Sequence, residues 1–200
     1  MVSAMSSVPS GERGAMMIEI LVTIVICVIG LWGLTEVQTR LQQSEVESYQ
    51  RSQALMLLED MEARLNLNRT QAARYVTASA LGPSTSCSGL TSNNSLAQTD
   101  LRQWCGLLQG VSETTTSGGT TSNVGSMIGA RGCVEDLGAG DFMVTVAWQG
   151  LAPLSAPPSS VTCGSGSYNQ TGTACTNDRC RRVLTTIVRV GDLTCTTTPC

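Results

Sequence analysis

The sequence predicts an α+β protein in which a long N-terminal helix leaves a membrane and packs on a small antiparallel sheet stapled by disulfides. Three observations lead to this fold class: an apolar N-terminal run that continues as a helix-forming stretch, cysteines concentrated in the second half, and strand-like alternation in that half. A length of 200 residues with 42% hydrophobic content allows one domain with a real core, or one domain with a short appendage.

The composition excludes several classes of function. The chain has no histidine and all 12 of its basic residues are arginine, which removes the usual general base and the lysine-based chemistries. The net charge of −3 and the pI near 4.9 leave no basic field for phosphate backbones. We therefore expect no catalysis, no cofactor or metal, and no nucleic-acid partner.

An apolar run, Ala15–Leu34, begins directly after the polar residues 1–14. At 1.5 Å per residue it spans roughly 30 Å, the thickness of the hydrocarbon core of a bilayer. An ordinary secretory signal has small residues at a cleavage site after its apolar segment, and none follow Leu34. The run is therefore predicted to be a transmembrane helix.

The membrane helix is predicted to continue into solvent, because no glycine or proline occurs from Leu34 to Arg69. Apolar residues recur there at steps of three and four, which is typical of one helix face. They are Leu34, Val37 and Leu41, and later Ala54, Leu57, Leu58, Met61 and Leu65. We expect this stripe to pack on the sheet.

Glu19 is the single charged residue of the apolar run. A carboxylate in hydrocarbon is costly, so an acid at this depth indicates a function. If the chain is cut between Gly14 and Ala15, the new ammonium group lies at a helix start, where positive charge needs a partner. Glu19, four residues further on, supplies one within the same subunit or to a neighbour.

This N-terminus resembles a known family. Gly14 followed by Ala-Met-Met-Ile-Glu-Ile-Leu-Val is similar to the class III leader and the G-(F)-T-L-I-E-V-L-V start of type IV pilins and type II secretion pseudopilins. The resemblance implies that prepilin peptidase cuts after Gly14 and N-methylates Ala15, and that Glu19 acts in recruitment and docking into a filament. Ala15 and Met16 differ from the Phe and Thr usual there.

A second resemblance covers most of the chain and points to PilV-type minor pilins. It is carried by RSQALMLLEDMEARLNLNR (51–69), DLRQWCGLLQ (100–109), RGCV (131–134), VTVAWQG (144–150) and CRRVLTTIVRVGDL (180–193). It implies a type IV pilin-like fold with a leader at 1–14, a membrane segment at 15–34, a soluble helix at 35–75 and a disulfide-rich head at 76–200.

The same resemblance implies partners and a location. Such a minor pilin would join other minor and major pilins in a priming or tip complex that can present an adhesin. It would lie in the inner membrane with a periplasmic head before assembly, and in the cell-surface pilus afterwards. Two alternatives stay open: a minor pseudopilin of type II secretion, and an uncleaved membrane-anchored ectodomain that binds a ligand through loops 76–99 and 150–179. A DNA-uptake pilin is disfavoured by the acidic balance.

Eight cysteines in the later, polar part of the chain predict structural disulfides, and hence an oxidising compartment. They are Cys87, Cys105, Cys133, Cys163, Cys175, Cys180, Cys195 and Cys200. The absence of any CxxC disfavours zinc. Small loops are plausible at Cys175–Cys180 and Cys195–Cys200, and we expect Cys87 or Cys105 to pair with Cys133 or Cys163. Cys27, in the apolar run, is interpreted as a small hydrophobic residue.

The second half is predicted to alternate short elements with long loops. We expect a loop at 76–99, a helix at 96–111 with Asp100 as a possible cap and Trp104 in the core, a mobile low-complexity segment at 112–126, strands at 129–137, 141–149 and 181–190, and a loop at 150–179. The strand at 141–149 alternates Phe142, Val144, Val146 and Trp148, which indicates one buried face.

Three charged clusters could be functional, but each also has a structural interpretation. Glu135, Asp136 and Asp141 could hold Ca²⁺, but a hairpin turn with acidic flanks is favoured. Acids at 59, 60 and 62 are interpreted as a solvated, partly paired helix face. Arg179, Arg181 and Arg182 form one basic cluster, which strand alternation would split between two faces.

Overall fold

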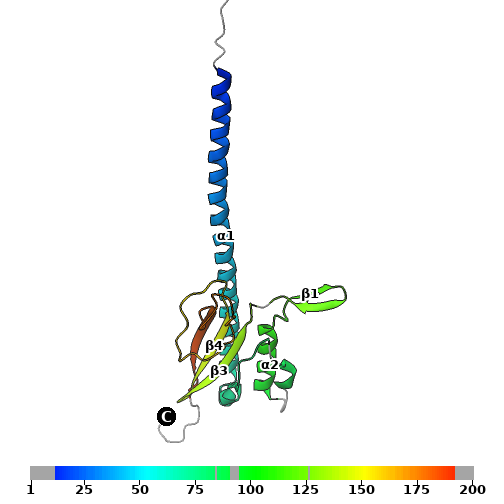
Figure 1. The fold of residues 1–200 in the computed structure, drawn as a ribbon. Coiled ribbons are helices and arrows are strands. Elements are labelled where there is room, and N and C mark those ends of the chain that lie inside the picture. Colours follow the sequence, from blue (N-terminus) through cyan, green and yellow to red (C-terminus); the bar gives the residue numbers. More distant parts are fainter. Residues whose placement is uncertain (1–11, 84, 91–94, 126, 192–200) are drawn as a thin grey trace, which may run out of the picture. The chain divides into compact units, whose positions relative to one another are not determined.

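The computed structural model describes residues 12–83, 85–90, 95–125 and 127–191 (Figure 1). Its elements are α1 (Glu12–Leu67), η1 (Arg69–Tyr75), η2 (Cys87–Leu90), α2 (Leu96–Leu108), β1 (Thr114–Ser117), β2 (Thr120–Asn123), β3 (Arg131–Gly138), β4 (Asp141–Gln149) and β5 (Arg181–Arg189). A long apolar N-terminal helix, small antiparallel sheets and disulfides confirm the coarse α+β class.

Contacts divide the chain into two compact units, one ending at Val46 and one beginning at Glu47. The first unit is α1 up to Val46. Its sequence is rich in leucine, isoleucine, valine and methionine and contains no proline, so nothing interrupts the hydrogen bonds of the helix. Gly30 and Gly33 lie inside it with no neighbouring atom near the position of a Cβ.

The second unit has one hydrophobic core, in which the last turns of α1 meet the sheet. Ala54, Leu58, Met61 and Leu65 of α1 belong to the same buried cluster as Phe142, Val144, Val146 and Trp148 of β4. The predicted packing of this part of the helix stripe on the strand is confirmed. Full burial of each large apolar side chain stabilises the fold by about 1.5–3 kcal/mol.

The main sheet is antiparallel with the strand order β3-β4-β5. Strands β3 and β4 form a hairpin whose turn, Gly138–Gly140, has positive φ at all three residues. The alternation of apolar residues predicts one buried face for β4, yet Thr145 and Ala147 on its second face are also fully buried. The long segment between β4 and β5 covers that face, which sequence alternation could not reveal.

Helix α2 begins earlier than its expected cap. The Oγ of Ser95 accepts a hydrogen bond from the backbone N–H of Gln98 at 3.3 Å, so Ser95 and not Asp100 is the N-cap. Trp104 is fully buried, as predicted, and its indole N–H donates to the carbonyl of Leu57 at 2.8 Å. Helix α2 is thereby fixed to α1.

The segment expected to be mobile at 112–126 contains a second, two-stranded sheet. Strands β1 and β2 pair antiparallel, and Gly118 and Gly119, both with positive φ, form the turn between them. A two-residue turn of two glycines between threonine-rich strands is a recognised hairpin signal. All eight strand residues are exposed, so backbone pairing rather than burial defines this element.

Three disulfides join six of the eight predicted cysteines. The bridges are Cys87–Cys105, Cys133–Cys163 and Cys175–Cys180. The expected pairing of Cys87 or Cys105 with Cys133 or Cys163 is wrong, because η2 carries Cys87 alongside α2, which carries Cys105. The expected Cys175–Cys180 loop is present, and Cys195–Cys200 lies outside the described residues.

Candidate functional site

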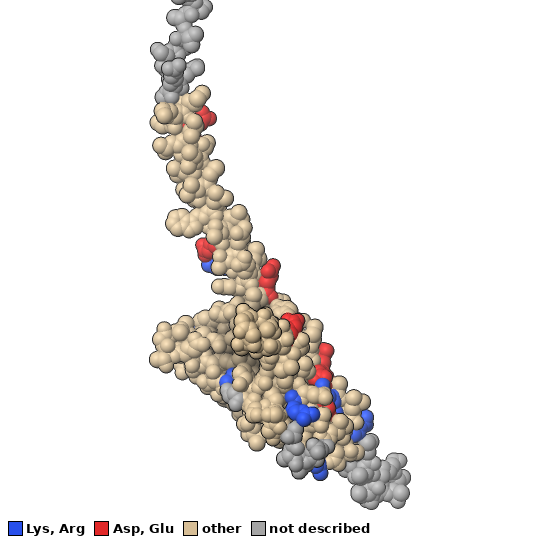
Figure 2. Space-filling view, turned by 90° about the vertical axis from the view of Figure 1, so that its right-hand side faces the viewer, with Lys and Arg blue, Asp and Glu red and all other residues tan. Residues whose placement is uncertain are grey.

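The N-terminal part of α1 is the candidate site, because it carries an apolar surface of membrane-spanning length. Its most apolar window has a mean hydropathy of 2.5, and within the described part of the chain only this helix is long and apolar enough to cross a membrane. In the space-filling view this stretch bears few charged side chains (Figure 2).

Nothing in the described chain covers this surface. Every side chain from Met16 to Val46 is exposed, including Met17 at 76%, Trp32 at 78% and Leu41 at 58%. The stripe predicted from the sequence therefore divides: its first part, Leu34–Leu41, is uncovered, whereas its last part lies in the core. An apolar surface of this extent marks contact with a membrane or with other subunits.

Glu19 lies on this helix as an exposed acid between apolar neighbours. Ile18 and Ile20 on either side are 68% and 54% exposed, and no described residue pairs with the carboxylate. Gly14 and Ala15 lie in the first turns of α1, which begins at Glu12. Ala15 and Glu19 are four residues apart, so they share one side of the helix one turn apart.

Three threonine hydroxyls of α1 are satisfied inside the helix. The hydroxyl of Thr23 donates to the carbonyl of Ile20 at 2.8 Å, and those of Thr35 and Thr39 donate to carbonyls four residues earlier. Such back-bonding removes the cost of a hydroxyl in hydrocarbon. Glu19 has no hydrogen-bond or ion-pair partner among the described residues.

Trp32 is a residue that the sequence analysis did not single out. It lies near the end of the predicted membrane segment and is the most exposed apolar side chain there. Tryptophan is enriched where hydrocarbon meets water, because its ring is apolar and its N–H is polar. Its place near the end of the apolar run is the sequence feature that could have identified it as a residue at the membrane surface.

Within the second unit, the last turns of α1 are joined to α2 by a partly buried polar network. Arg64 donates to Asp60 at 2.8 Å and to Asp100 of α2 at 2.9 Å, and the hydroxyl of Tyr75 also donates to Asp100. Burial and the hydrogen bond to Asp100 raise the pKa of Tyr75 to about 12. The network fixes the last turns of α1 to α2.

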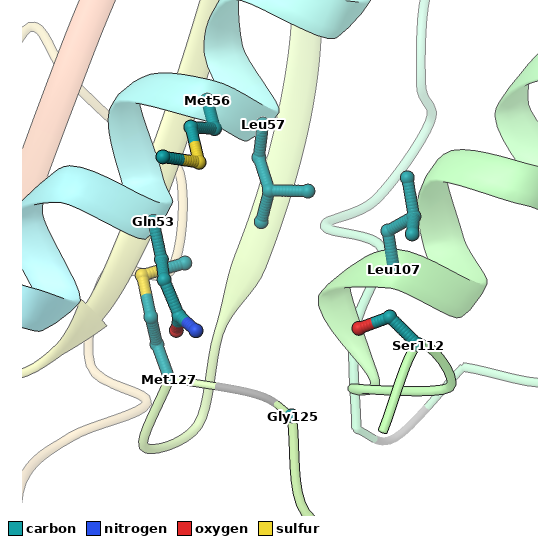
Figure 3. A pocket seen from close by; sticks show the side chains of 7 residues that line it. All are labelled: Gln53, Met56, Leu57, Leu107, Ser112, Gly125 and Met127. Carbon is teal, nitrogen blue, oxygen red and sulfur yellow. The ribbon is translucent and has the colours of Figure 1, made fainter.

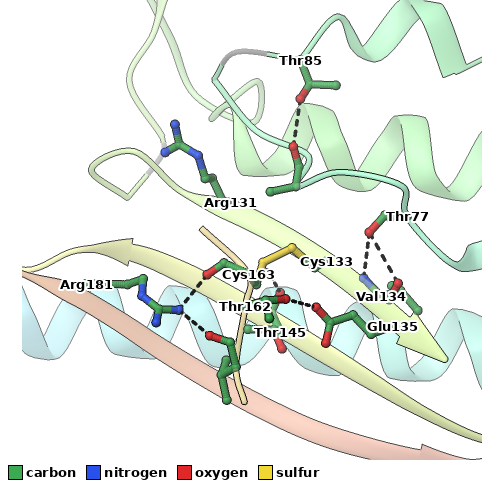
Figure 4. The surroundings of a disulfide bond; sticks show 12 residues. Thr77, Thr85, Arg131, Cys133, Val134, Glu135, Thr145, Thr162, Cys163 and Arg181 are labelled. Carbon is green, nitrogen blue, oxygen red and sulfur yellow. Dashed lines mark hydrogen bonds between the residues drawn. A yellow bond between two sulfur atoms is a disulfide. The ribbon is translucent and has the colours of Figure 1, made fainter. Parts of the chain in front are cut away.

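The basic cluster predicted at the start of β5 does not form a surface patch. Arg181 is buried and donates to the carbonyls of Val161 and Cys163 at 2.8 and 3.0 Å, where it holds the covering loop beside the Cys133–Cys163 bridge (Figure 4). Arg182 donates to the carbonyl of Ala152 at 2.6 Å and lies 3.5 Å from Glu47. Both arginines thus serve the fold.

The acidic residues around the β3–β4 turn have protein partners, as the hairpin interpretation requires. Glu135 accepts from Thr162 at 2.6 Å, and Asp136 accepts from the backbone N–H of Gly138 at 2.8 Å. Two hydrogen bonds from Arg189, at 2.7 Å each, lower the pKa of Asp141. No group of three metal-ligating side chains meets within the described residues.

The described residues of the second unit line more than one hollow, and an open one of about 520 Å³ borders Arg64, Arg102 and Val111. One pocket of about 150 Å³ lies between α1, α2 and the segment after β2 (Figure 3). Its lining consists of Gln53, Met56, Leu57, Leu107, Ser112, Gly125 and Met127. Pockets that bury a small ligand usually measure about 300–1,000 Å³, so this hollow is too small for such a role.

Scans against protein-family models, curated proteins and solved structures found no match. The class of protein therefore rests on the fold and the site themselves. The chain is an α+β protein with a long N-terminal apolar helix that could span a membrane, and with a second unit of small antiparallel sheets bridged by disulfides.

Proposed function

We propose that the chain is a minor pilin of a type IV pilus, which assembles through its N-terminal helix into the priming or tip complex. The observation that carries the proposal is the uncovered apolar helix Met16–Val46, with a single acid in its membrane-length part at the fifth position after Gly14. The resemblance of the residues around Gly14 and of five later segments to pilins supports the same function.

In this proposal the helix has two successive environments. Before assembly, Ala15–Leu34 lies in the inner membrane, where its exposed apolar side chains contact lipid. After prepilin peptidase cuts behind Gly14, the helix packs against the helices of other pilins, which replace the lipid around the same side chains. In both environments the apolar surface is shielded from water.

Glu19 supplies the specific contact in this transfer. The ammonium group created at Ala15 needs a counter-charge, and Glu19 has no partner among the described residues of its own chain. Where water is excluded, an ammonium and a carboxylate attract each other far more strongly than at an exposed surface. We therefore assign Glu19 to docking against the N-terminus of this subunit or of its neighbour.

The second unit is proposed to be the head that the filament presents. Its core is complete without the first 46 residues, because the apolar side chains that fill it begin at Ala54. Other minor and major pilins are its proposed neighbours, and an adhesin at the tip is a further candidate partner. No catalytic role is proposed.

The test compares Glu19→Ala with Glu36→Ala in cells that carry the other pilins. Glu36 is an exposed acid on the same helix, paired with Arg40 of its own chain at 2.7 Å, which makes it a matched control. We expect both variants to insert in the membrane and only Glu19→Ala to be missing from sheared pili. Equal recovery of both variants in pili would overturn the proposed role of Glu19.

The same cells separate the alternatives. A photo-cross-linking residue can be placed at Met16. Cross-links from it to type II secretion components instead of pilus components would favour the pseudopilin. Retention of residues 1–14 in the mature protein would favour an anchored ectodomain, and would move the search for function to the loops of the second unit.

A further inference from the structure

The two edges of the main sheet differ in the hydrogen bonding of their outward backbone groups. Along β3, the segment Thr77–Leu81 acts as a cover: Leu81 and Gly132 exchange two backbone hydrogen bonds at 2.8 Å. The N–H of Thr77 donates to the carbonyl of Val134 at 2.9 Å, and its hydroxyl accepts from the N–H of Val134. At Gly132 and Val134 the outward backbone groups of this edge are therefore satisfied.

The opposite edge is β5, and the register shows which of its backbone groups point outward. Gly150 donates to Cys180, and Val190 donates to Gly140, so the even-numbered residues of β5 bond to β4. Odd-numbered residues then direct their N–H and C=O away from the sheet. From Thr185 to Arg189, none of these outward groups has a hydrogen-bond partner among the described residues.

This edge lacks the usual protections against pairing with another strand. The stretch Val183–Val188 contains no charge and no proline, and the β4–β5 register has no bulge. Thr185 and Ile187 are exposed, the latter at 60%. Arg182 and Arg189 flank this stretch; Arg182 lies 3.5 Å from Glu47, and Arg189 donates two hydrogen bonds to Asp141.

We propose that the Thr185–Arg189 edge of β5 binds an extended, uncharged strand of another protein by β-augmentation. Alternating donors and acceptors along an edge match one ligand class, an extended peptide backbone. The stretch Val183–Val188 offers no counter-charge, so an uncharged strand rich in threonine and β-branched residues complements it, whereas a charged strand would be desolvated without compensation. This surface goes beyond assembly through the N-terminal helix and does not depend on it.

The test uses the full chain in detergent micelles and a fluorescent peptide, Thr-Val-Thr-Ile-Thr-Val-Thr, with blocked termini. Its control is the same peptide with alternate backbone nitrogens methylated, which removes the hydrogen bonds along one edge. The variants are Thr185→Pro and Ile187→Pro, which remove outward N–H groups that β4 does not use, and Thr185→Val, which keeps the N–H. Circular dichroism and the count of free thiols check the fold of each variant.

We expect saturable binding of the unmethylated peptide to the wild type and to Thr185→Val, at least tenfold weaker binding to both proline variants, and no binding of the methylated peptide. The peptide comparison keeps the test valid if a proline variant does not fold. The proposal is overturned if the wild type binds neither peptide or both equally. Peptide binding that appears only after removal of residues 192–200 would mean that the chain covers its own edge. A wild-type dimer that Thr185→Pro abolishes would mean that a second copy of the chain covers the edge. Either result also overturns the proposal.

Discussion

Gly132 of β3 lies directly under the indole ring of Trp104. A Cβ placed on Gly132 would come within 2.2 Å of Cη2 of Trp104 and within 2.7 Å of a methyl carbon of Leu108. The absence of a side chain at this position allows α2 to approach the sheet. Because Trp104 also donates to the carbonyl of Leu57 on α1, the ring has little freedom to move away.

Gly132→Ala is therefore expected to destabilise the second unit. Overpacking a core by one methyl group typically costs about 1–3 kcal/mol, and the contact here involves a rigid ring. Urea unfolding followed by tryptophan fluorescence measures the loss. Gly89→Ala, at a position with no neighbouring atom within 4 Å, serves as the control and should change stability by less than about 1 kcal/mol. Equal stability of the two variants would contradict the packing described for Trp104.

Tyr75 should make the second unit sensitive to alkaline pH. An unfolded tyrosine has a pKa near 10, whereas burial and the hydrogen bond to Asp100 raise the pKa of Tyr75 to about 12. Below pH 10 the stabilisation is fully present. Between about pH 10 and 12 the unfolded state loses the proton first, so the free energy of unfolding falls, by at most about 2 kcal/mol.

Tyr75→Phe provides the comparison for this pH dependence. Without the hydroxyl, the variant should be less stable than the wild type at pH 8, by about 1–2 kcal/mol, because Asp100 loses a buried donor. Its stability should also fall less between pH 10 and 12. The burial of Tyr168 raises its pKa as well, and this effect is common to both proteins. Parallel pH profiles of the two proteins would show that Tyr75 does not titrate as described.

Disulfides of different loop length should differ in their contribution to stability. The Cys133–Cys163 bridge closes a sequence separation of 30 residues and Cys175–Cys180 closes one of 5. Loop-closure entropy predicts that replacing the first pair by serine costs about 1.5 kcal/mol more than replacing the second. Urea unfolding of the two double variants measures the difference. If the short bridge proves the more important one, the covering loop is held mainly by Arg181 and not by Cys163.

Much of the fold follows from local patterns that the sequence displays openly. The apolar positions at Ala54, Leu58, Met61 and Leu65 recur with the helix period, and the strand around Val144 alternates, so their packing on each other was predictable. Trp104 was likewise placed in the core. These elements bury large apolar surfaces, and the spacing of apolar residues in the sequence predicts which face of an element is buried.

Other features depend on contacts that no local pattern encodes. Hairpin β1–β2 buries nothing and is defined by the Gly118-Gly119 turn, which was overlooked inside a low-complexity segment. The partners of Cys87 and Cys133 depend on which segments lie side by side, and spacing along the chain does not determine this. The burial of Thr145 depends on a loop that Arg181 holds, although an arginine on a strand ordinarily indicates an exposed position.

For the candidate site, the sequence predicted the residues and the structure describes their surroundings. Glu19 is predicted because an acid in an apolar run is costly, whereas Gly14 and Ala15 are predicted from the resemblance to the class III leader of pilins. The lack of any described partner for Glu19 and the exposure of the whole stretch Met16–Val46 are properties of a single chain. In the proposed function their partners belong to a membrane and then to a filament, which a single sequence does not contain.

The most direct measurement is the intact mass and N-terminal peptide of the membrane-extracted protein, from cells with and without prepilin peptidase and before and after reduction. The proposed function predicts a start at Ala15, with or without one methyl group, only when the peptidase is present. Reduction should then add two hydrogens for each bridge, which is six for the three described disulfides and eight if Cys195 and Cys200 are also joined. A protein that begins at Met1 in both strains would contradict the assignment to pilins.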